Sequence, residues 1–350
     1  MPDASRSPTT FYRGLPVCVT GGAGFIGSHL VDALVERGAQ VSVIDDLSNG
    51  RIENLSRHAG RVRFVQGSIL DERALREAIG SARVVFHEAA LGSVPMSVEQ
   101  PALFHEVNAT GTLRVLEEAR RAGVKRVVYA ASSSAYGDSE SLPKRETDAP
   151  APMSPYAASK LAGEDLVRAY ANCYEIDGVS LRYFNIFGPR QRGDSAYAAV
   201  VPAFIEALLH GEPAVIYGDG GQTRDFTSVA NAVGANLLAG ASAKPLRGEV
   251  INIACGERYS LLELLRMVAT ILRAEPAVEH RHARAGDVRH SQADIEAARQ
   301  MLGYDVEVGF EEGLRQTIDW FRSQKKHGAG GDAATRERIS TGRIGGAGSP

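Results

Sequence analysis

Runs of β-branched and aliphatic residues alternate with longer amphipathic segments through the first half of the chain. The short runs predict strands at residues 15–20, 40–45, 62–66, 83–87 and 126–130. Between them, apolar residues recur at helical spacing, which predicts helices at residues 28–37, 71–79 and 108–122. Strands that alternate with helices in this way are typically parallel and joined by crossover helices. The predicted fold class is therefore α/β, with a Rossmann-type doubly wound parallel sheet.

The second half is less regular, with a glycine-rich loop at residues 217–221, then an apparent strand at 249–254 and a helix at 261–273. We expect an N-terminal extension (1–14), a Rossmann domain (15–180) to which later segments return, and a smaller C-terminal substrate-binding lobe formed mainly by residues 181–322. From residue 325 the chain turns to Gly, Ala, Ser, Thr and Arg. Such a segment buries little apolar surface, so residues 325–350 are predicted to form a disordered tail.

Composition and charge narrow the kind of partner. A chain of 350 residues, 44% hydrophobic and 23% charged, has ordinary globular composition. Its formal net charge of -3 provides no basic field for nucleic acid or an anionic membrane. The chain shows neither a secretory signal nor an apolar run near the roughly 20 residues of a membrane span. Its three cysteines, Cys18, Cys173 and Cys255, lack metal-ligand spacing. We expect a cytoplasmic enzyme of small-molecule chemistry, without a metal.

A glycine-rich turn links the first predicted strand to the first predicted helix. Gly21, Gly24 and Gly27 stand in the spacing G-x-x-G-x-x-G. In a dinucleotide fingerprint the first glycine permits a tight turn, the second lets the backbone approach the pyrophosphate, and the third lets the helix lie close to the strand. Asp45 ends the second strand, where a carboxylate can accept hydrogen bonds from the adenosine ribose and would repel a 2′-phosphate. The predicted cofactor is therefore NAD rather than NADP.

Tyr156 and Lys160 stand four residues apart on a predicted helix, so their side chains share one face. An adjacent ammonium and a positive nicotinamide ring both favour phenolate, so we expect a lowered pKa that makes Tyr156 a general base. A serine-rich segment, residues 131–137, follows the strand at 126–130. It lies at the carboxyl edge of the sheet, where its hydroxyls can reach a ligand.

With these three motifs in this order, the chain resembles the extended short-chain dehydrogenase/reductase superfamily, in its NAD-dependent epimerase/dehydratase branch. The likeness runs from about residue 15 to 322. Further matching segments lie at residues 87–90, 108–112, 182–189, 218–220, 224–226 and 286–291. The resemblance implies NAD as cofactor, a UDP-sugar as substrate and a homodimer.

The resemblance also implies roles for single residues: Ser132 would contact O4 of the sugar, Tyr156 would be the base, and Lys160 would hold the nicotinamide ribose. Arg224 and Arg284 would clamp phosphates, Asn185 would contact the diphosphate and Asp287 the uridine ribose. The implied cofactor contacts are Gly21, Gly24, Phe25, Ile26, Gly27, Asp45, Asn49, Gly50, Ser68, Ile69, Ala89, Ala90, Asn108, Tyr156, Lys160 and Tyr183. The implied substrate contacts are Gly92, Ser93, Ser132, Ser133, Tyr156, Asn185, Gln191, Ala199, Arg224, Arg284, Asp287 and Ser291.

Two departures inform the interpretation. The family often has aspartate at position 68, where this chain has Ser68, so the expected adenine contact is weaker. Dehydratases and decarboxylases of this branch resemble one another in an acidic residue before the Tyr-Gly of the serine segment, where this chain has Ser133 and Ser134. Elimination needs an acid to protonate the leaving hydroxyl, whereas 4-epimerisation needs one base and a hydride acceptor. We therefore predict a UDP-sugar 4-epimerase that works through a 4-keto intermediate.

The segments at residues 90–95 and 286–291 look most like bacterial UDP-N-acetylglucosamine 4-epimerases. Relatives restricted to plain hexoses carry a tyrosine at position 291, whereas Ser291 leaves volume for a 2-acetamido group beside Gly92, Ser93 and Ser133. The predicted reaction interconverts UDP-GlcNAc and UDP-GalNAc, with UDP-Glc and UDP-Gal as further substrates. A UDP-uronate 4-epimerase or another nucleotide-sugar oxidoreductase of the family stays open. So does an inactive dinucleotide-binding regulator, although the intact Ser-Tyr-Lys set argues against it.

Overall fold

A seven-stranded parallel sheet forms the centre of the computed structural model, which describes residues 8–193, 198–283 and 288–340. The strand order is β11-β6-β5-β4-β1-β2-β3, and every neighbouring pair is parallel. The order reverses between β1 and β4, so their carboxyl ends open the crevice in which ligands of such sheets bind. The strands are β1 (Pro16–Thr20), β2 (Gln40–Asp45), β3 (Val62–Gln66), β4 (Val84–His87), β5 (Arg126–Ser132), β6 (Asp177–Tyr183) and β11 (Glu249–Ile253).

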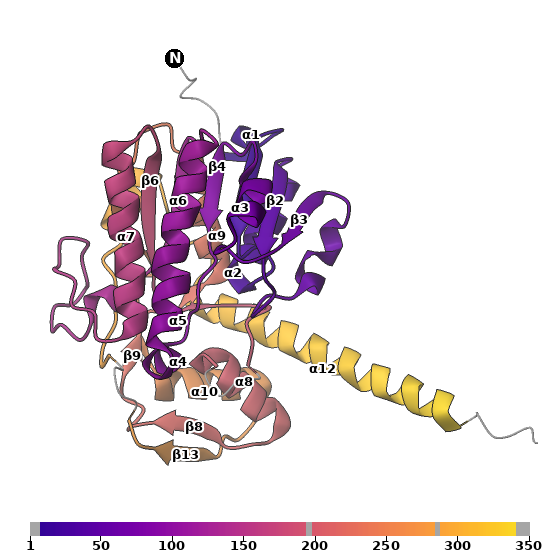
Figure 1. Cartoon of the computed structure of the whole chain (residues 1–350). Coiled ribbons are helices and arrows are strands. Elements are labelled where there is room, and N and C mark those ends of the chain that lie inside the picture. Colours follow the sequence, from indigo (N-terminus) through magenta and orange to yellow (C-terminus); the bar gives the residue numbers. More distant parts are fainter. Residues whose placement is uncertain (1–7, 194–197, 284–287, 341–350) are drawn as a thin grey trace, which may run out of the picture.

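Helices cover both faces of this sheet, and Figure 1 views it from the side of α6 and α7. One buried apolar cluster joins the sheet to α3 (Glu72–Ile79), α6 (Gly111–Arg121) and α7 (Pro155–Cys173). A second cluster joins the opposite face to α2 (Phe25–Glu36), α9 (Val229–Ala241) and α11 (Glu296–Leu302). The doubly wound α/β fold predicted from the sequence is therefore confirmed.

The sequence pattern missed one central strand, β6. Its apolar residues Val179, Leu181 and Tyr183 alternate with Ser180 and Arg182, as in a strand with one solvated face. In the structure both faces of β6 are buried, and the Arg182 guanidinium is compensated by an ion pair with a buried carboxylate on α7. Because Ser180 and Arg182 interrupt the apolar residues, the segment gives too little signal for a central buried strand.

A smaller lobe lies beyond the carboxyl edge of the sheet and is assembled from separated segments (Figure 1). Its apolar cluster joins α8 (Val200–His210), α10 (Leu261–Leu272) and the start of α12 (Phe310–Ser340). The lobe also contains paired short strands: β8 (Ala214–Tyr217) with β13 (Val278–Arg281), β9 (Thr223–Arg224) with β12 (Tyr259–Ser260), and β7 (Ile186–Phe187) with β10 (Thr227–Ser228). The shorter helical elements of the chain are α1 (Pro8–Phe11), η1 (Ile52–His58), α4 (Val94–Glu99), α5 (Pro101–His105), η2 (Glu106–Thr110) and η3 (Ser133–Tyr136).

Both ends of the described chain contain helix. Close to the N-terminus, Tyr12 is fully buried, and its hydroxyl donates to the Leu237 carbonyl oxygen of α9 at 2.7 Å. At the other end, α12 projects away from the body of the molecule and continues through residues 325–340, part of the predicted disordered tail (Figure 1). Ala, Lys, Arg and Glu in this stretch have good helix propensity, which offsets its glycines. Residues 341–350 of the predicted tail lie outside the described residues. Over the described part of the chain, no helix is long and apolar enough to cross a membrane.

Candidate active site

The glycine-rich turn lies between β1 and α2 at the carboxyl edge of the sheet. Gly21 has φ +67°, and a Cβ there would lie 2.7 Å from the backbone nitrogen of Ala89. A Cβ at Gly27 would lie 2.2 Å from the Gly21 carbonyl oxygen, so only glycine lets α2 begin this close to β1. The turn leads into the N-terminus of the 12-residue helix α2 at Gly24, followed by the part-exposed Phe25 and Ile26. Free N–H groups and the helix dipole there suit a pyrophosphate, so a dinucleotide fits this cradle.

Asp45 lies beside this turn at the end of β2. Its carboxylate accepts hydrogen bonds from the backbone nitrogens of Ala23 at 3.0 Å and Leu47 at 2.9 Å. Burial raises the pKa of Asp45, and these two hydrogen bonds lower it. A Cβ at Gly50 would lie 2.8 Å from a carboxylate oxygen, so the loop after β2 passes directly over Asp45. Each carboxylate oxygen keeps a second lone pair, which suits a ribose hydroxyl.

The other residues expected to contact the cofactor, of which Ser68 and Ile69 are expected at adenine, differ in their surroundings. The Ser68 hydroxyl accepts a hydrogen bond from the Leu70 backbone nitrogen at 3.2 Å, within its own turn. Ile69 is buried and packs closely on the backbone of Gly111 at the start of α6. Asn49 is exposed, whereas Ala89 and Ala90 are half-buried after β4.

The side chain of Asn108, another expected cofactor contact, forms three hydrogen bonds inside the protein. Its side-chain oxygen accepts from the Leu91 backbone nitrogen at 2.9 Å. Its amide nitrogen donates to the Leu91 carbonyl oxygen at 3.1 Å and to the Ser159 hydroxyl at 3.0 Å. Asn108 therefore ties the loop after β4 to α7, which indicates a positioning role.

Ser132 and Tyr156 come together where β5 ends and α7 begins. The Ser132 hydroxyl accepts from the Ser134 backbone nitrogen at 3.2 Å and lies 2.8 Å from the Ser134 hydroxyl. Burial raises the pKa of Tyr156, and a hydrogen bond with the Ser132 hydroxyl opposes that rise. The ring of Phe104 packs edge-on against Tyr156, with the ring centres 6.4 Å apart. The neighbouring Ser133 is half-buried in η3.

Lys160 follows one turn later on α7, and its side chain is buried. Its ammonium nitrogen lies 4.3 Å from the centre of the Tyr129 ring. Burial lowers the pKa of Lys160 to about 8, while the Glu88 and Glu164 carboxylates raise it. The expectation that Lys160 lowers the pKa of Tyr156 is wrong for the protein alone, because burial dominates at Tyr156 and the ammonium lies over the Tyr129 ring.

The expected substrate contacts other than Ser132, Ser133 and Tyr156 lie in the smaller lobe and in two loops. Asn185 has φ +38°, and its side-chain nitrogen donates to the Asp225 carbonyl oxygen at 3.2 Å. Arg224 and Ser291 are both held by Thr223. The Thr223 carbonyl oxygen accepts from the Arg224 guanidinium at 2.8 Å and from the Ser291 backbone nitrogen at 3.1 Å. Gly92 and Ala199 are exposed, and the Ser93 hydroxyl caps α4. Arg284 and Asp287 lie outside the described residues.

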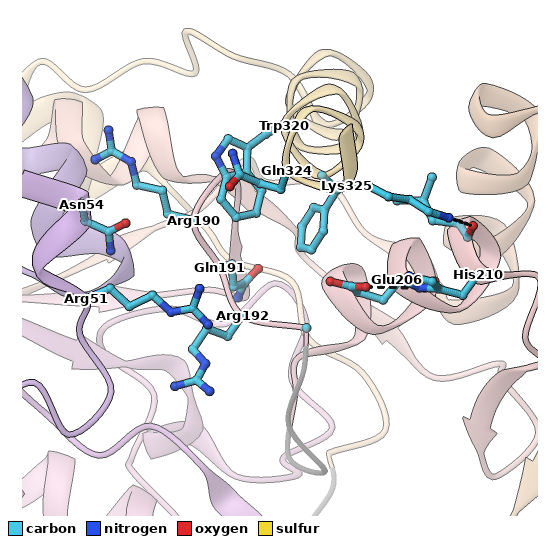
Figure 2. Close-up of a pocket in the computed structure, with 13 residues that line it drawn as sticks. Arg51, Asn54, Arg190, Gln191, Arg192, Glu206, His210, Trp320, Gln324 and Lys325 are labelled. Atoms are coloured by element: carbon cyan, nitrogen blue, oxygen red, sulfur yellow. Dashed lines mark hydrogen bonds and ion pairs between the residues drawn. The ribbon is translucent and has the colours of Figure 1, made fainter. Parts of the chain in front are cut away.

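Gln191 lies in a pocket that none of the other predicted site residues lines (Figure 2). The pocket has a volume of about 280 Å³ and lies between η1, α8 and α12. Its lining includes the basic residues Arg51, Arg190, Arg192, His210 and Lys325. The Gln191 side-chain nitrogen donates to the Ile186 carbonyl oxygen at 3.1 Å. This hydrogen bond ties Gln191 to β7, directly after Asn185, and its contact with the substrate stays a prediction.

Glu88 was given no role from the sequence, although it stands in one of the matching segments. It follows β4 directly and is half-buried. The Tyr183 hydroxyl donates to a Glu88 carboxylate oxygen at 2.8 Å. An acid directly after the buried strand β4 is the available signal, but its partner on β6 cannot be identified from sequence spacing.

The comparisons with known proteins agree with this geometry. The profile of the NAD dependent epimerase/dehydratase family matches residues 17–254. A UDP-glucose 4-epimerase from Mycolicibacterium smegmatis is 40% identical over 312 residues, which cover 88% of this chain and 99% of the relative. The chain belongs to the NAD-dependent epimerase/dehydratase family.

Two solved structures of the family show what similar chains bind. A UDP-N-acetylglucosamine 4-epimerase from Methanobrevibacter ruminantium, in complex with UDP-N-acetylmuramic acid, is 39% identical with a TM-score of 0.84, covering 89% of this chain and 99% of its own. MoeE5 in complex with UDP-glucuronic acid and NAD is 38% identical with a TM-score of 0.81, covering 88% and 99%. The predicted family and its NAD cofactor are confirmed, and the chain is a UDP-sugar 4-epimerase by family.

Proposed function

We propose that this protein interconverts UDP-GlcNAc and UDP-GalNAc by inverting C4 of the sugar, with UDP-Glc and UDP-Gal as further substrates. The observation that carries the choice is Ser291, a small residue fixed by its backbone hydrogen bond beside β9. Arg224, the proposed phosphate clamp, lies on the same strand. A serine there leaves room for a 2-acetamido group, which a bulkier side chain would fill.

The proposed chemistry needs one base at the sugar. Tyr156, as phenolate, removes the proton from O4 while the Ser132 hydroxyl holds that oxygen. NAD, which the Gly21–Gly27 turn and Asp45 would hold, would supply the hydride acceptor for C4. The sugar, now a 4-ketone, turns over in the site, so that hydride comes back to its other face and Tyr156 returns the proton to O4. The proton and hydride lost in the first half are regained in the second, and the cycle is redox-neutral.

The serine segment supports epimerisation over elimination. Ser134 stands where a dehydratase would need an acid, and its hydroxyl lies 2.8 Å from that of Ser132. A hydroxyl at this place cannot protonate a leaving group at neutral pH as a carboxylic acid would. The 4-keto sugar is therefore expected to be returned as an epimer.

A UDP-uronate 4-epimerase is the second candidate, because MoeE5 is solved with UDP-glucuronic acid at 38% identity. The deciding experiment incubates the enzyme separately with UDP-GlcNAc, UDP-Glc and UDP-GlcA and resolves the epimers by chromatography. We expect UDP-GalNAc as the fastest-forming product. Conversion of UDP-GlcA alone would establish the uronate enzyme instead.

We also propose a cytoplasmic homodimer. Support comes from large apolar side chains that are exposed on consecutive helices, namely Val98 on α4, Leu103 on α5 and Leu113 on α6. A second copy would remove this surface from water. Light scattering on the eluting protein should give twice the chain mass, whereas the mass of one chain would refute the dimer.

A further inference from the structure

Three side chains from different parts of the sequence, Asn236, Tyr183 and Glu88, form a hydrogen-bonded relay, and the Glu88 charge raises the pKa of Lys160. The Asn236 side-chain nitrogen, on α9, donates to the Tyr183 hydroxyl oxygen at 2.6 Å. The Tyr183 hydroxyl donates in turn to Glu88 at 2.8 Å. Asn236 and Tyr183 are both buried, so each of these contacts replaces a hydrogen bond to water.

The direction of this relay is fixed by the backbone. The Asn236 side-chain nitrogen also donates to the Ala232 carbonyl oxygen at 2.9 Å, and a carbonyl oxygen only accepts. The amide nitrogen must therefore stay on this side and donate to Tyr183, whose own proton then points to Glu88. A carboxylate that accepts this proton is favoured over a neutral acid. Burial raises the pKa of Glu88 to about 7, while the Tyr183 hydrogen bond and the Lys160 charge lower it.

The other carboxylate that faces Lys160 is already paired. Glu164, on α7, binds the Arg182 guanidinium of β6 through two hydrogen bonds of 3.0 Å and 2.7 Å, and both side chains are buried. Its charge is therefore largely balanced by Arg182. Glu88 forms no such pair with a cation among the residues that the structure describes.

The remaining groups around Lys160 carry no negative charge at neutral pH. His87, on β4, bonds through its two ring nitrogens to the hydroxyls of Thr20 and Thr112, and burial lowers its pKa to about 3. Tyr129, on β5, has a pKa raised well above its usual value by burial. Burial likewise raises the pKa of Tyr156, one turn earlier on α7. Glu88 is thus the acid that can sustain a positive charge on Lys160.

We propose that Glu88 is a positioning residue that works through Lys160. Its carboxylate, oriented by Tyr183 and Asn236, keeps the buried Lys160 ammonium charged, so that Lys160 can hold the nicotinamide ribose. This role of Glu88 depends on the proposed role of Lys160 but not on which sugar is turned over. Glu88 itself touches neither sugar nor cofactor in this scheme.

The sign of the pH effect follows from these charges. Glu88 raises the pKa of Lys160, so removing the Glu88 charge lowers that pKa, and the ammonium is lost at a lower pH. The effect is present above the pKa of Glu88, about 7, where Glu88 is ionised. It fades at lower pH, where protonated Glu88 is as neutral as glutamine.

The test is a pH titration of Lys160 in the NAD-loaded holoenzyme, followed by NMR on protein with ¹³C-labelled lysine. The resonance is assigned by its absence in Lys160→Arg. In Glu88→Gln, which keeps an acceptor for the Tyr183 hydroxyl, we expect the midpoint of the Lys160 titration to fall by about one pH unit. Glu118→Gln is the control, because Glu118 is a buried glutamate that lies on α6 and pairs with Arg76 and Arg121.

Kinetics provide the second readout. The alkaline limb of kcat/KM should move to lower pH in Glu88→Gln, with the rates of variant and wild type converging below pH 7. An unchanged Lys160 midpoint in Glu88→Gln, or an equal fall in Glu118→Gln, would overturn the proposal whatever happens to turnover. If Glu88→Gln does not fold, Tyr183→Phe replaces it: the lost hydrogen bond raises the pKa of Glu88, so the Lys160 midpoint should again fall at neutral pH. No fall in that variant would equally refute the role of Glu88.

Discussion

Tyr156 shows how burial and charge compete at a single residue. Burial raises its pKa, and the Ser132 hydroxyl offsets only part of that rise. A phenol in this state is a weak base at neutral pH. The positive nicotinamide ring of bound NAD would add the missing stabilisation of the phenolate, so the base becomes active only in the loaded enzyme.

The first prediction removes that base. Tyr156→Phe keeps the ring that packs on Phe104 but has no phenolate, so kcat should fall by about 10²-fold or more. Ser132→Ala should lower kcat by a smaller factor, because it removes a hydrogen bond but leaves the base Tyr156 in place. Melting temperature and UDP-sugar affinity should stay close to wild type. Near-normal turnover in Tyr156→Phe would assign the base to another residue.

The second prediction concerns substrate range at position 291. Ser291→Tyr adds a phenol ring where we place the acetamido group, so turnover of UDP-GlcNAc and UDP-GalNAc should fall at least about tenfold. Turnover of UDP-Glc and UDP-Gal should survive or rise. Ser291→Ala, which keeps the volume, is the control and should preserve the range. An equal decline for both substrate pairs in Ser291→Tyr would show that the size of residue 291 does not determine the substrate range.

At the scale of elements, the sequence predicted those whose signal is local. The predicted strands and helices of the first half each carry their own apolar period. Their boundaries in the structure lie within a few residues of the predicted ones. What failed depends on contacts between distant segments. The hydrogen bonds by which Asn108 ties Leu91 to Ser159 could not be read from the sequence, and β6 became recognisable only once Arg182 had its partner on α7.

The third prediction tests the close approach of α2 to β1. In Gly27→Ala the new Cβ would meet the Gly21 carbonyl oxygen at 2.2 Å, so the helix must move away. We expect a loss of stability of about 1–3 kcal/mol, measured by denaturant unfolding, together with weaker NAD retention.

Gly234, in α9, is the matched control because a Cβ there meets nothing within 4 Å. Gly234→Ala removes glycine's backbone freedom from a helix and should be neutral or stabilising by up to about 1 kcal/mol. Equal stability of the two variants would mean that helix-to-strand packing at Gly27 is not tight.

At the scale of the whole molecule, the catalytic crevice is built by contacts that cross long stretches of chain. Tyr183 donates a hydrogen bond to Glu88, 95 residues earlier in the chain. Strand β11, which follows the first segments of the smaller lobe in the sequence, pairs with β6 of the central sheet. The family resemblance allowed the crevice to be anticipated, since its motifs stand in order along the sequence. The hydrogen-bonding partners inside it depend on side-chain direction, which periodicity does not determine.

The last prediction follows from a cycle that returns the cofactor to its starting state. Because each turnover oxidises and then reduces the sugar, the enzyme gains nothing by releasing NAD between steps, and the Gly21–Gly27 turn with Asp45 should retain it. Protein purified without added cofactor and then denatured with acid should release NAD, identified by chromatography, with NADP absent. Asp45→Ala should release clearly less, because the ribose hydroxyls lose their acceptor. Recovery of NADP alone, together with activity that strictly requires NADP, would contradict the assignment of Asp45 to the adenosine ribose.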